Sequence, residues 1–333
     1  MPRRAVIFGV EGTALTPWER GFLREADPWG FILFARNIQD PAQLSALTTE
    51  LRDVVGWLAP ILIDQEGGRV QRMRAPHWRE YLPALDQMRR ARDPLRAQWV
   101  RNRLIAAELH AVGIDVNCAP LADLVEDGTH PVLLNRLYGE DIATVTAAAR
   151  ACADGLLAGG VLPVLKHIPG YGRARVDSHH DLPRVDVPLA ELHARDFAPF
   201  RALRDLPMGM TAHIVMGAID PDRPATTSAR VMQVIRDDIG FDGLIMTDDL
   251  SMQALQGTLA DRAAASLAAG CALVLHCNGK RADMEEVAAA TGLMTDRAVA
   301  RGDRALAMRK APDLCDISEL QDELHASLEG TGG

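Results

Sequence analysis

The segment VLPVLKH, residues 161–167, is one of eight short apolar runs that decide the fold of this chain. Its apolar residues follow one another without the polar alternation of a strand that has one face in water. Such runs are typical of strands in a parallel sheet that is covered on both faces. The run ends directly in Lys166 and His167, so two ionisable side chains are expected at the carboxyl end of this strand.

Seven similar runs recur along the chain, and each is followed by a turn and a segment with helical spacing. They are AVIFGV from residue 5, GFILFA from 30, PILIDQ from 60, GIDVNCAP from 113, MGMTAHIV from 208, GLIMTDD from 243 and CALVLHC from 271. Helices are predicted between the runs at 42–56, 93–111, 142–158, 188–204, 228–238, 258–269 and 282–291.

Eight alternating strand and helix units predict an α/β fold, the (β/α)8 TIM barrel. A doubly wound open sheet is the structural alternative, but it requires a glycine-rich phosphate turn after the first strand. The segment GVEGTALT, residues 9–16, lacks that GxGxxG pattern. No Pro-rich or Ser-rich linker divides the chain, so we predict a single domain over residues 1–333 that ends in a helix and a frayed tail from about 312.

The composition excludes several classes of function. The 36 basic and 45 acidic residues leave a net charge of -9 and are scattered along the chain, which argues against nucleic-acid binding. The sequence contains no uncharged apolar stretch of about 18 residues that could cross a membrane, and the start MPRRAVIFGVEG is too interrupted for a signal peptide. The five cysteines show no CxxC spacing and suit a reducing compartment. We therefore expect a cytoplasmic monomer.

Polar residues follow five of the predicted strands at their carboxyl ends, where barrel enzymes carry their active sites. They are Asp64, Gln65 and Glu66; Asn117 and Asp123; Lys166 and His167; His213; and Asp248 and Asp249. Any one of them could be an ordinary loop residue or helix cap, but their agreement predicts a polar pocket rich in carboxylates. Sugars require paired hydrogen bonds to their hydroxyl groups, which Asp64, Arg72 and Lys166 could supply.

Five segments of the chain resemble signature motifs of family 3 glycoside hydrolases, in particular the short bacterial β-N-acetylglucosaminidases of peptidoglycan recycling. The segments are LIDQEGGRVQRM from residue 62, LKHIPGYG from 165, VDSHHDLP from 176, MTAHIVMGAIDPDRPATTS from 210 and GFDGLIMTDDLSM from 240. They occur in the order of the family, and the resemblance extends from about residue 8 to 290.

The resemblance implies a TIM barrel and assigns roles to individual residues. The nucleophile falls on Asp248, and the acid/base on His179 paired with Asp177, both on the loop after strand five. Sugar binding falls on Asp64, Arg72, Arg136, Lys166 and His167. The chain departs from the family at Tyr171, where histidine is common, and in LNRLYGED, residues 134–141, around the sugar-binding arginine.

Side-chain geometry adds independent arguments for these roles. Neighbouring side chains on a strand point to opposite faces, so Asp248 and Asp249 cannot both face the barrel mouth, and the spacing alone does not choose between them. Asp177 and His179 share one face of an extended segment, so the carboxylate can fix the imidazole tautomer. Histidine, with a pKa of about 6.5, can donate a proton without burial, which suits a loop hinged at glycines such as Gly170.

The sequence therefore predicts a retaining exo-β-N-acetylglucosaminidase that removes terminal N-acetylglucosamine from GlcNAc-1,6-anhydroMurNAc peptides without a cofactor. Three alternatives remain open: a phosphorylase or transglycosylase on the same site, a non-catalytic sugar-binding barrel, and a metal-dependent barrel hydrolase. No metal is expected, because His179 and His180 diverge and the chain has no HxH or HExxH pattern. His213 is either part of the pocket wall or a structural histidine.

Overall fold

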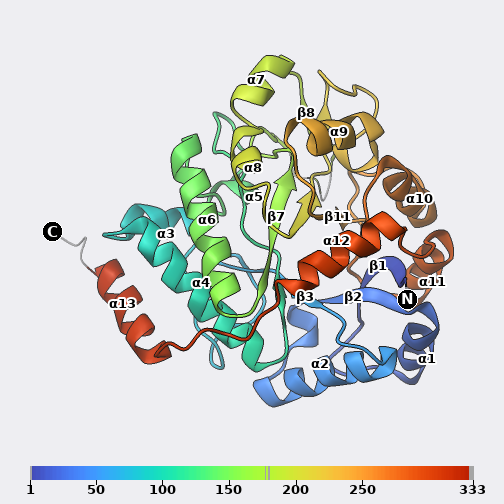
Figure 1. Cartoon of the computed structure of the whole chain (residues 1–333), viewed down its shortest axis with the longest axis horizontal. Helices are drawn as coiled ribbons and strands as arrows, with labels where there is room; N and C mark the ends of the chain where they lie inside the picture. Colours follow the sequence, from blue (N-terminus) through green and yellow to red (C-terminus); the bar gives the residue numbers. More distant parts are fainter. Residues whose placement is uncertain (1, 177, 179–180, 330–333) are drawn as a thin grey trace.

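The computed structural model of the chain describes residues 2–176, 178 and 181–329, and its centre is a closed barrel of eight parallel strands (Figure 1). The strands are β1 (Arg4–Gly9), β2 (Pro28–Leu33), β3 (Ile61–Ile63), β6 (Val116–Asn117), β7 (Leu162–Ile168), β9 (Met208–Thr211), β11 (Leu244–Asp249) and β12 (Leu273–His276). Each falls on one of the eight apolar runs, so the predicted (β/α)8 fold is confirmed. β1 pairs with β12 and closes the barrel, with Val6 opposite Val274.

Helices surround the barrel (Figure 1). They are α1 (Pro17–Ala26), α2 (Pro41–Val55), α3 (Ala84–Arg90), α4 (Pro94–Ala111), α5 (Pro131–Leu134), α6 (Ile142–Ala158), α7 (Leu189–Ala194), α8 (Ala198–Ala202), α9 (Ala229–Gln233), α10 (Leu259–Ala269), α11 (Arg281–Ala290), α12 (Asp296–Ala307) and α13 (Ile317–Glu329). Short 3-10 turns form at Ala35–Asn37 and Ala225–Thr227, and α9 continues as a π-helical turn over Val234–Asp238. No helix in the described part of the chain is both long and apolar enough to cross a membrane.

The helix predicted at 188–204 is two helices, which is the clearest error in the predicted elements. α7 ends at Ala194, and α8 begins at Ala198 with Pro199 in its first turn. Proline has no N–H to continue a helix and clashes with the preceding turn, but it is tolerated at a helix start. One helix therefore ends before Pro199, and a second helix begins at Ala198. The prediction also omitted α1, α3, α5 and α12, although Thr16 and Glu19 form a capping box at the start of α1.

Two buried clusters show which strand residues point inward. Leu244 and Met246 of β11 belong to the inner cluster with Leu162 and Val164 of β7. Their neighbours, such as Ile245, pack outward against the helices. Because side chains alternate along a strand, the next inward positions lie at the carboxyl ends of these strands. The barrel thus opens there into polar side chains.

Two small additions shape the barrel mouth. After β3, the chain folds into a hairpin of β4 (Gln65–Gly67) and β5 (Val70–Gln71), and β8 (Arg184–Val185) pairs with β10 (Val215–Met216). At the other end of the sequence, α13 packs on α4, where Arg96 and Glu323 form a two-pronged ion pair at 2.7 and 2.8 Å. The predicted C-terminal helix is thus present, and residues 330–333 lie outside the described chain.

Candidate active site

A cavity of about 220 Å³ opens at the carboxyl ends of the barrel strands. Among the residues that line it are Asp64, Arg72, Arg136, Lys166, His167, His213, Asp248 and Asp249. The structure therefore brings together seven of the nine residues predicted for the site. The other two, Asp177 and His179, lie outside the described residues.

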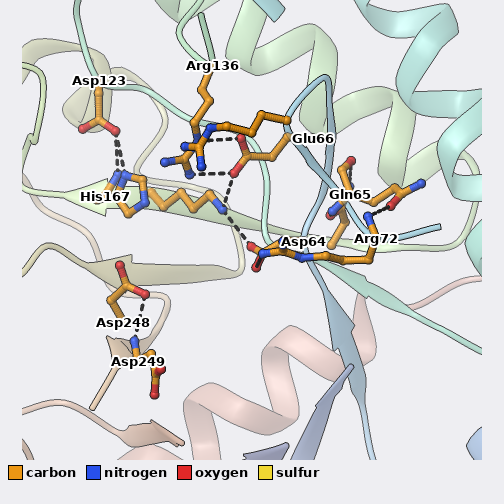
Figure 2. Close-up of polar contacts among 12 residues, drawn as sticks. Asp64, Gln65, Glu66, Arg72, Asp123, Arg136, His167, Asp248 and Asp249 are labelled. Atoms are coloured by element: carbon orange, nitrogen blue, oxygen red, sulfur yellow. Dashed lines mark hydrogen bonds and ion pairs between the residues drawn. The ribbon is translucent and has the colours of Figure 1, made fainter. Parts of the chain in front are cut away.

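Asp64 joins two cations on one wall of the cavity (Figure 2). One oxygen of Asp64 accepts from Nζ of Lys166 at 3.0 Å, and the other accepts from Nη2 of Arg72 at 3.0 Å. Burial alone would raise the pKa of Asp64, but the two cations outweigh it and hold that pKa well below its usual range. Nε of Arg72 is buried and has no hydrogen-bond partner among the described residues. This wall therefore presents fixed charges to the cavity.

Glu66 is a charged residue of this network to which the sequence assigned no role. Its carboxylate makes a two-pronged ion pair with Arg136, at 2.8 and 2.9 Å, and also contacts Nζ of Lys166 at 2.7 Å. Burial would raise the pKa of Glu66, yet Arg136 and Lys166 lower it to about 2. The sequence signal for a role of Glu66 is its position in the QEGG segment, just after β3. The contact with Arg136, 70 residues away, was not readable from the sequence.

Asp123 fixes the histidine of the site. Its Oδ2 lies 2.8 Å from Nδ1 of His167, and its Oδ1 accepts from the backbone N–H of Tyr171 at 2.7 Å. A carboxylate at Nδ1 holds the proton there and leaves Nε2 toward the cavity. The register of β7 shifts between Leu165 and Ile168, which lets the consecutive residues Lys166 and His167 both line the cavity.

The two adjacent carboxylates of β11 point in opposite directions (Figure 2). Oδ1 of Asp249 accepts from Ser251 at 3.0 and 3.1 Å and from the backbone N–H of Cys277 at 3.2 Å. Asp248 accepts from the N–H of Asp249 at 2.8 Å. Both residues nevertheless contribute to the cavity lining, which differs from the expectation that only one would face the mouth, because β11 ends here and the chain turns. Asp248 continues the inward positions of Leu244 and Met246.

His213 is both part of the pocket wall and a structural histidine, the two roles that the sequence left open. It lines the cavity, and both ring nitrogens have partners. Nε2 lies 3.0 Å from the carbonyl oxygen of Asp249, and Nδ1 lies 2.7 Å from the hydroxyl of Thr226. A carbonyl only accepts, so Nε2 carries a proton. Burial lowers the pKa of His213, which favours the neutral ring. The imidazole thus braces the end of β11 beside Asp248.

Ser178 is the described residue between the two predicted partners of the acid/base pair. Its backbone N–H donates to the hydroxyl of Tyr171 at 3.1 Å, and its carbonyl accepts from the N–H of Ala254 at 3.2 Å. Ser178 is buried and lines the cavity. In the part of the chain that the structure describes, no three His, Cys, Asp or Glu side chains are grouped to hold a metal ion.

The buried ion pairs predict that the protein loses stability in acid. The pKa of Glu66 in the folded protein is about 2, against 4.5 for an ordinary glutamate, and that of Asp64 is lowered as well. The contribution of Glu66 is therefore fully present above pH 4.5 and is lost as the pH falls from 4.5 toward 2, and that of Asp64 is lost as the pH falls below 3.8. We expect the free energy of unfolding to fall by about 1.4 kcal/mol per pH unit per group in that window.

Urea unfolding at pH 6, 4 and 3 measures this loss. The Glu66→Gln variant lacks one of the two carboxylates, so its stability should fall less steeply between pH 4 and 3 than that of the wild type. Equal slopes for the two proteins would contradict the assignment to Glu66.

The sequence matches proteins of one family over most of its length. The model described as "Glycosyl hydrolase family 3 N terminal domain" matches residues 20–304. The chain is 38% identical to a beta-hexosaminidase of Bordetella avium, over 94% of this chain and 91% of that protein. It is 37% identical to a beta-hexosaminidase of Methylococcus capsulatus, over 97% of this chain and 95% of that protein.

Solved structures of the same family superpose on the barrel. NagZ from Neisseria gonorrhoeae, in complex with N-trifluoroacetyl-D-glucosamine, is 32% identical and matches with a TM-score of 0.87 over 99% of both chains. A family 3 beta-N-acetylglucosaminidase from Paenibacillus is 29% identical and matches with a TM-score of 0.85 over 97% of this chain and 67% of that one.

Proposed function

Because the chain belongs to family 3 of the glycosyl hydrolases and is a β-N-acetylglucosaminidase of that family, we propose that it removes terminal N-acetylglucosamine from GlcNAc-1,6-anhydroMurNAc peptides. The reaction proceeds by double displacement with retention of the anomeric configuration. The observation that carries the proposal is the juxtaposition in one cavity of the Asp248 carboxylate with the charged wall of Asp64, Arg72 and Lys166.

Asp248 is the nucleophile in this mechanism. The N–H of Asp249 holds one oxygen of the Asp248 carboxylate, which lies at the end of an inward-facing row on β11. The carboxylate of Asp249, in contrast, is occupied by Ser251 and the backbone of Cys277. Asp248 attacks the anomeric carbon and forms a glycosyl ester, which water then hydrolyses.

His179 is the acid and then the base, and Asp177 orients its ring. Both assignments rest on the sequence, since the two residues lie outside the described chain. Ser178, the described residue between them in the sequence, lines the cavity, so this loop reaches the site at that residue. His179 protonates the leaving sugar and later takes a proton from the attacking water.

The remaining wall binds the sugar. Asp64, Arg72, Lys166 and His167 offer both acceptors and donors, which paired hydroxyl groups require. The cavity of about 220 Å³ is smaller than the roughly 300–1,000 Å³ of a drug-sized pocket. This size suits one sugar ring and supports removal of a terminal residue. The N-trifluoroacetyl-D-glucosamine in the NagZ complex supports the same sugar for this chain.

We further propose that the enzyme acts as a cytoplasmic monomer, without cofactor. All five cysteines are free thiols, four of them buried, which suits a reducing compartment. Transfer to phosphate is the competing reaction, because a histidine repels an incoming anion less than a carboxylate does.

The test is hydrolysis of an aryl β-N-acetylglucosaminide with and without phosphate, followed by NMR of the products. Free N-acetylglucosamine, released first as the β anomer, is the expected product in both buffers. Sugar 1-phosphate as the main product would replace the hydrolase with a phosphorylase. An α anomer as the first product would exclude double displacement, and no turnover would revive the non-catalytic sugar-binding barrel.

A further inference from the structure

Glu66 lies behind the cavity wall and not in it. Its side chain is 4% exposed, and it is absent from the residues that line the cavity. The backbone carbonyl of Glu66 accepts a hydrogen bond from the buried guanidinium of Arg101, which in turn donates to Gln87. The backbone of Glu66 is therefore held in a packed layer between the barrel mouth and α3 and α4, and its buried carboxylate lies behind the residues that line the cavity.

This carboxylate organises two cations that do line the cavity (Figure 2). Oε1 contacts both Nη2 of Arg136, at 2.8 Å, and Nζ of Lys166, at 2.7 Å. Oε2 accepts from Nε of Arg136 at 2.9 Å. Glu66 thus engages one edge of the planar guanidinium, so the remaining N–H groups are held in a fixed orientation.

We propose that Glu66 is a positioning residue for substrate binding, which sets the direction in which Arg136 and Lys166 present their N–H donors to the sugar. The inference rests on the proposed function, because it takes the occupant of the cavity to be N-acetylglucosamine. Glu66 acts on the sugar only through Arg136 and Lys166. Its negative charge also explains why these two cations can lie in one buried wall.

Charge balance explains why a neutral side chain cannot replace Glu66. The ion pairs form a row in which the two carboxylates alternate with three cations: Arg136, Glu66, Lys166, Asp64 and Arg72. Without the charge of Glu66, Asp64 is the remaining carboxylate of this row, and no negative charge separates Arg136 from Lys166. A glutamine amide has one acceptor oxygen, and its NH₂ group would face a donor of Arg136 or Lys166. At least one cation would then turn toward other partners and lose its alignment with the sugar.

The Glu66→Gln variant tests the proposal with an aryl β-N-acetylglucosaminide and with N-acetylglucosamine as a calorimetric ligand. We expect KM and the Kd of N-acetylglucosamine to rise about 30-fold, the size expected for the loss of one partner of a buried charge pair, while kcat changes much less. Glu66→Asp keeps the charge but is one methylene too short to contact both cations, so its KM should be intermediate.

Asp115→Asn is the matched control. Asp115 is also a largely buried carboxylate between two guanidinium groups, those of Arg52 at 3.0 Å and Arg309 at 2.5 Å, but it lies just before β6, at the amino end of the barrel. Asp115→Asn should lower the thermal midpoint and leave KM within about 2-fold of the wild type, which is the scatter expected for a site far from the cavity.

Two results would overturn the proposal. One is a KM and Kd for Glu66→Gln within 2-fold of the wild type. The other is an equal rise of KM in Asp115→Asn, which would make the effect one of general stability. Either result leaves the proposed function intact, because that function is tested separately by the products that the wild type releases from the glycoside.

Discussion

The Asp248→Asn variant is expected to lose on the order of 10⁴-fold or more in kcat, because Asp248 is the proposed nucleophile and replacing a covalent nucleophile removes the reaction path itself. Asparagine keeps the shape of the side chain and can still accept from the N–H of Asp249. The variant should therefore fold normally and retain its affinity for N-acetylglucosamine. Steady-state kinetics on an aryl β-N-acetylglucosaminide and calorimetry with the free sugar measure the two properties separately.

Asp249→Asn is the control for this prediction. The Oδ1 of Asp249 accepts from Ser251 and from the backbone of Cys277, and asparagine keeps that acceptor oxygen, so Asp249→Asn should also fold normally. We expect a much smaller loss of kcat than for Asp248→Asn. An inactive Asp249→Asn together with an active Asp248→Asn would show that Asp249, and not Asp248, is the nucleophile.

The sequence predicted the barrel because its signals are local and repeated. Each strand is an apolar run, and seven of the eight runs precede a predicted helix, so the repeating unit could be recognised without any long-range information. The error at 188–204 arose where Pro199 interrupts a segment that otherwise has helical spacing. Because proline is tolerated at the start of a helix but not in its interior, Pro199 is a sequence signal for dividing this segment into two helices.

The direction of the β11 carboxylates shows where sequence reasoning ends. Leu244, Ile245 and Met246 are all apolar, because this strand is covered on both faces, so hydropathy does not reveal which of them face the barrel interior. Knowledge of the two packed clusters is needed to see that Asp248 shares the inward parity. The family resemblance assigns the nucleophile to Asp248, and the inward position of Asp248 on β11 is a physical reason to favour that assignment.

The partners of the site residues were the least predictable part. Polar residues after five strands predicted a charged pocket, and that pocket exists. Which charges pair depends on the β4–β5 hairpin, which returns Arg72 to Asp64, and on the loop around α5, which brings Arg136 to Glu66. The first contact spans eight residues and depends on the hairpin, whereas the second spans 70 residues and depends on the closed barrel.

The Lys166→Met variant is expected to have the second-largest effect. Lys166 is 2% exposed and contacts both Asp64, at 3.0 Å, and Glu66, at 2.7 Å. Methionine fills the space but leaves the two buried carboxylates with one cation fewer. Breaking a buried ion pair in this way lowers the free energy of unfolding by about 3–5 kcal/mol. We also expect kcat/KM to fall about 10³-fold, because the sugar loses a charged donor and the wall loses its order.

Stability as a function of pH separates this explanation from simple misfolding. In the wild type, Lys166 helps to hold the pKa values of Asp64 and Glu66 below their usual range. Both pKa values should rise in the variant, so the stabilisation that the wild type loses between pH 4.5 and 2 is already absent at neutral pH. The difference in unfolding free energy between the two proteins must then shrink as the pH falls below about 4.

Urea unfolding of wild type and Lys166→Met at pH 7, 4 and 3 measures that difference, with Lys280→Met at an exposed position as the control. The control should match the wild type at every pH. A constant difference between Lys166→Met and wild type would mean that the variant suffers from poor packing alone. A shrinking difference would show that the charge of Lys166 stabilises the barrel mouth through Asp64 and Glu66, and the loss of kcat/KM would show that the same side chain is needed for the reaction.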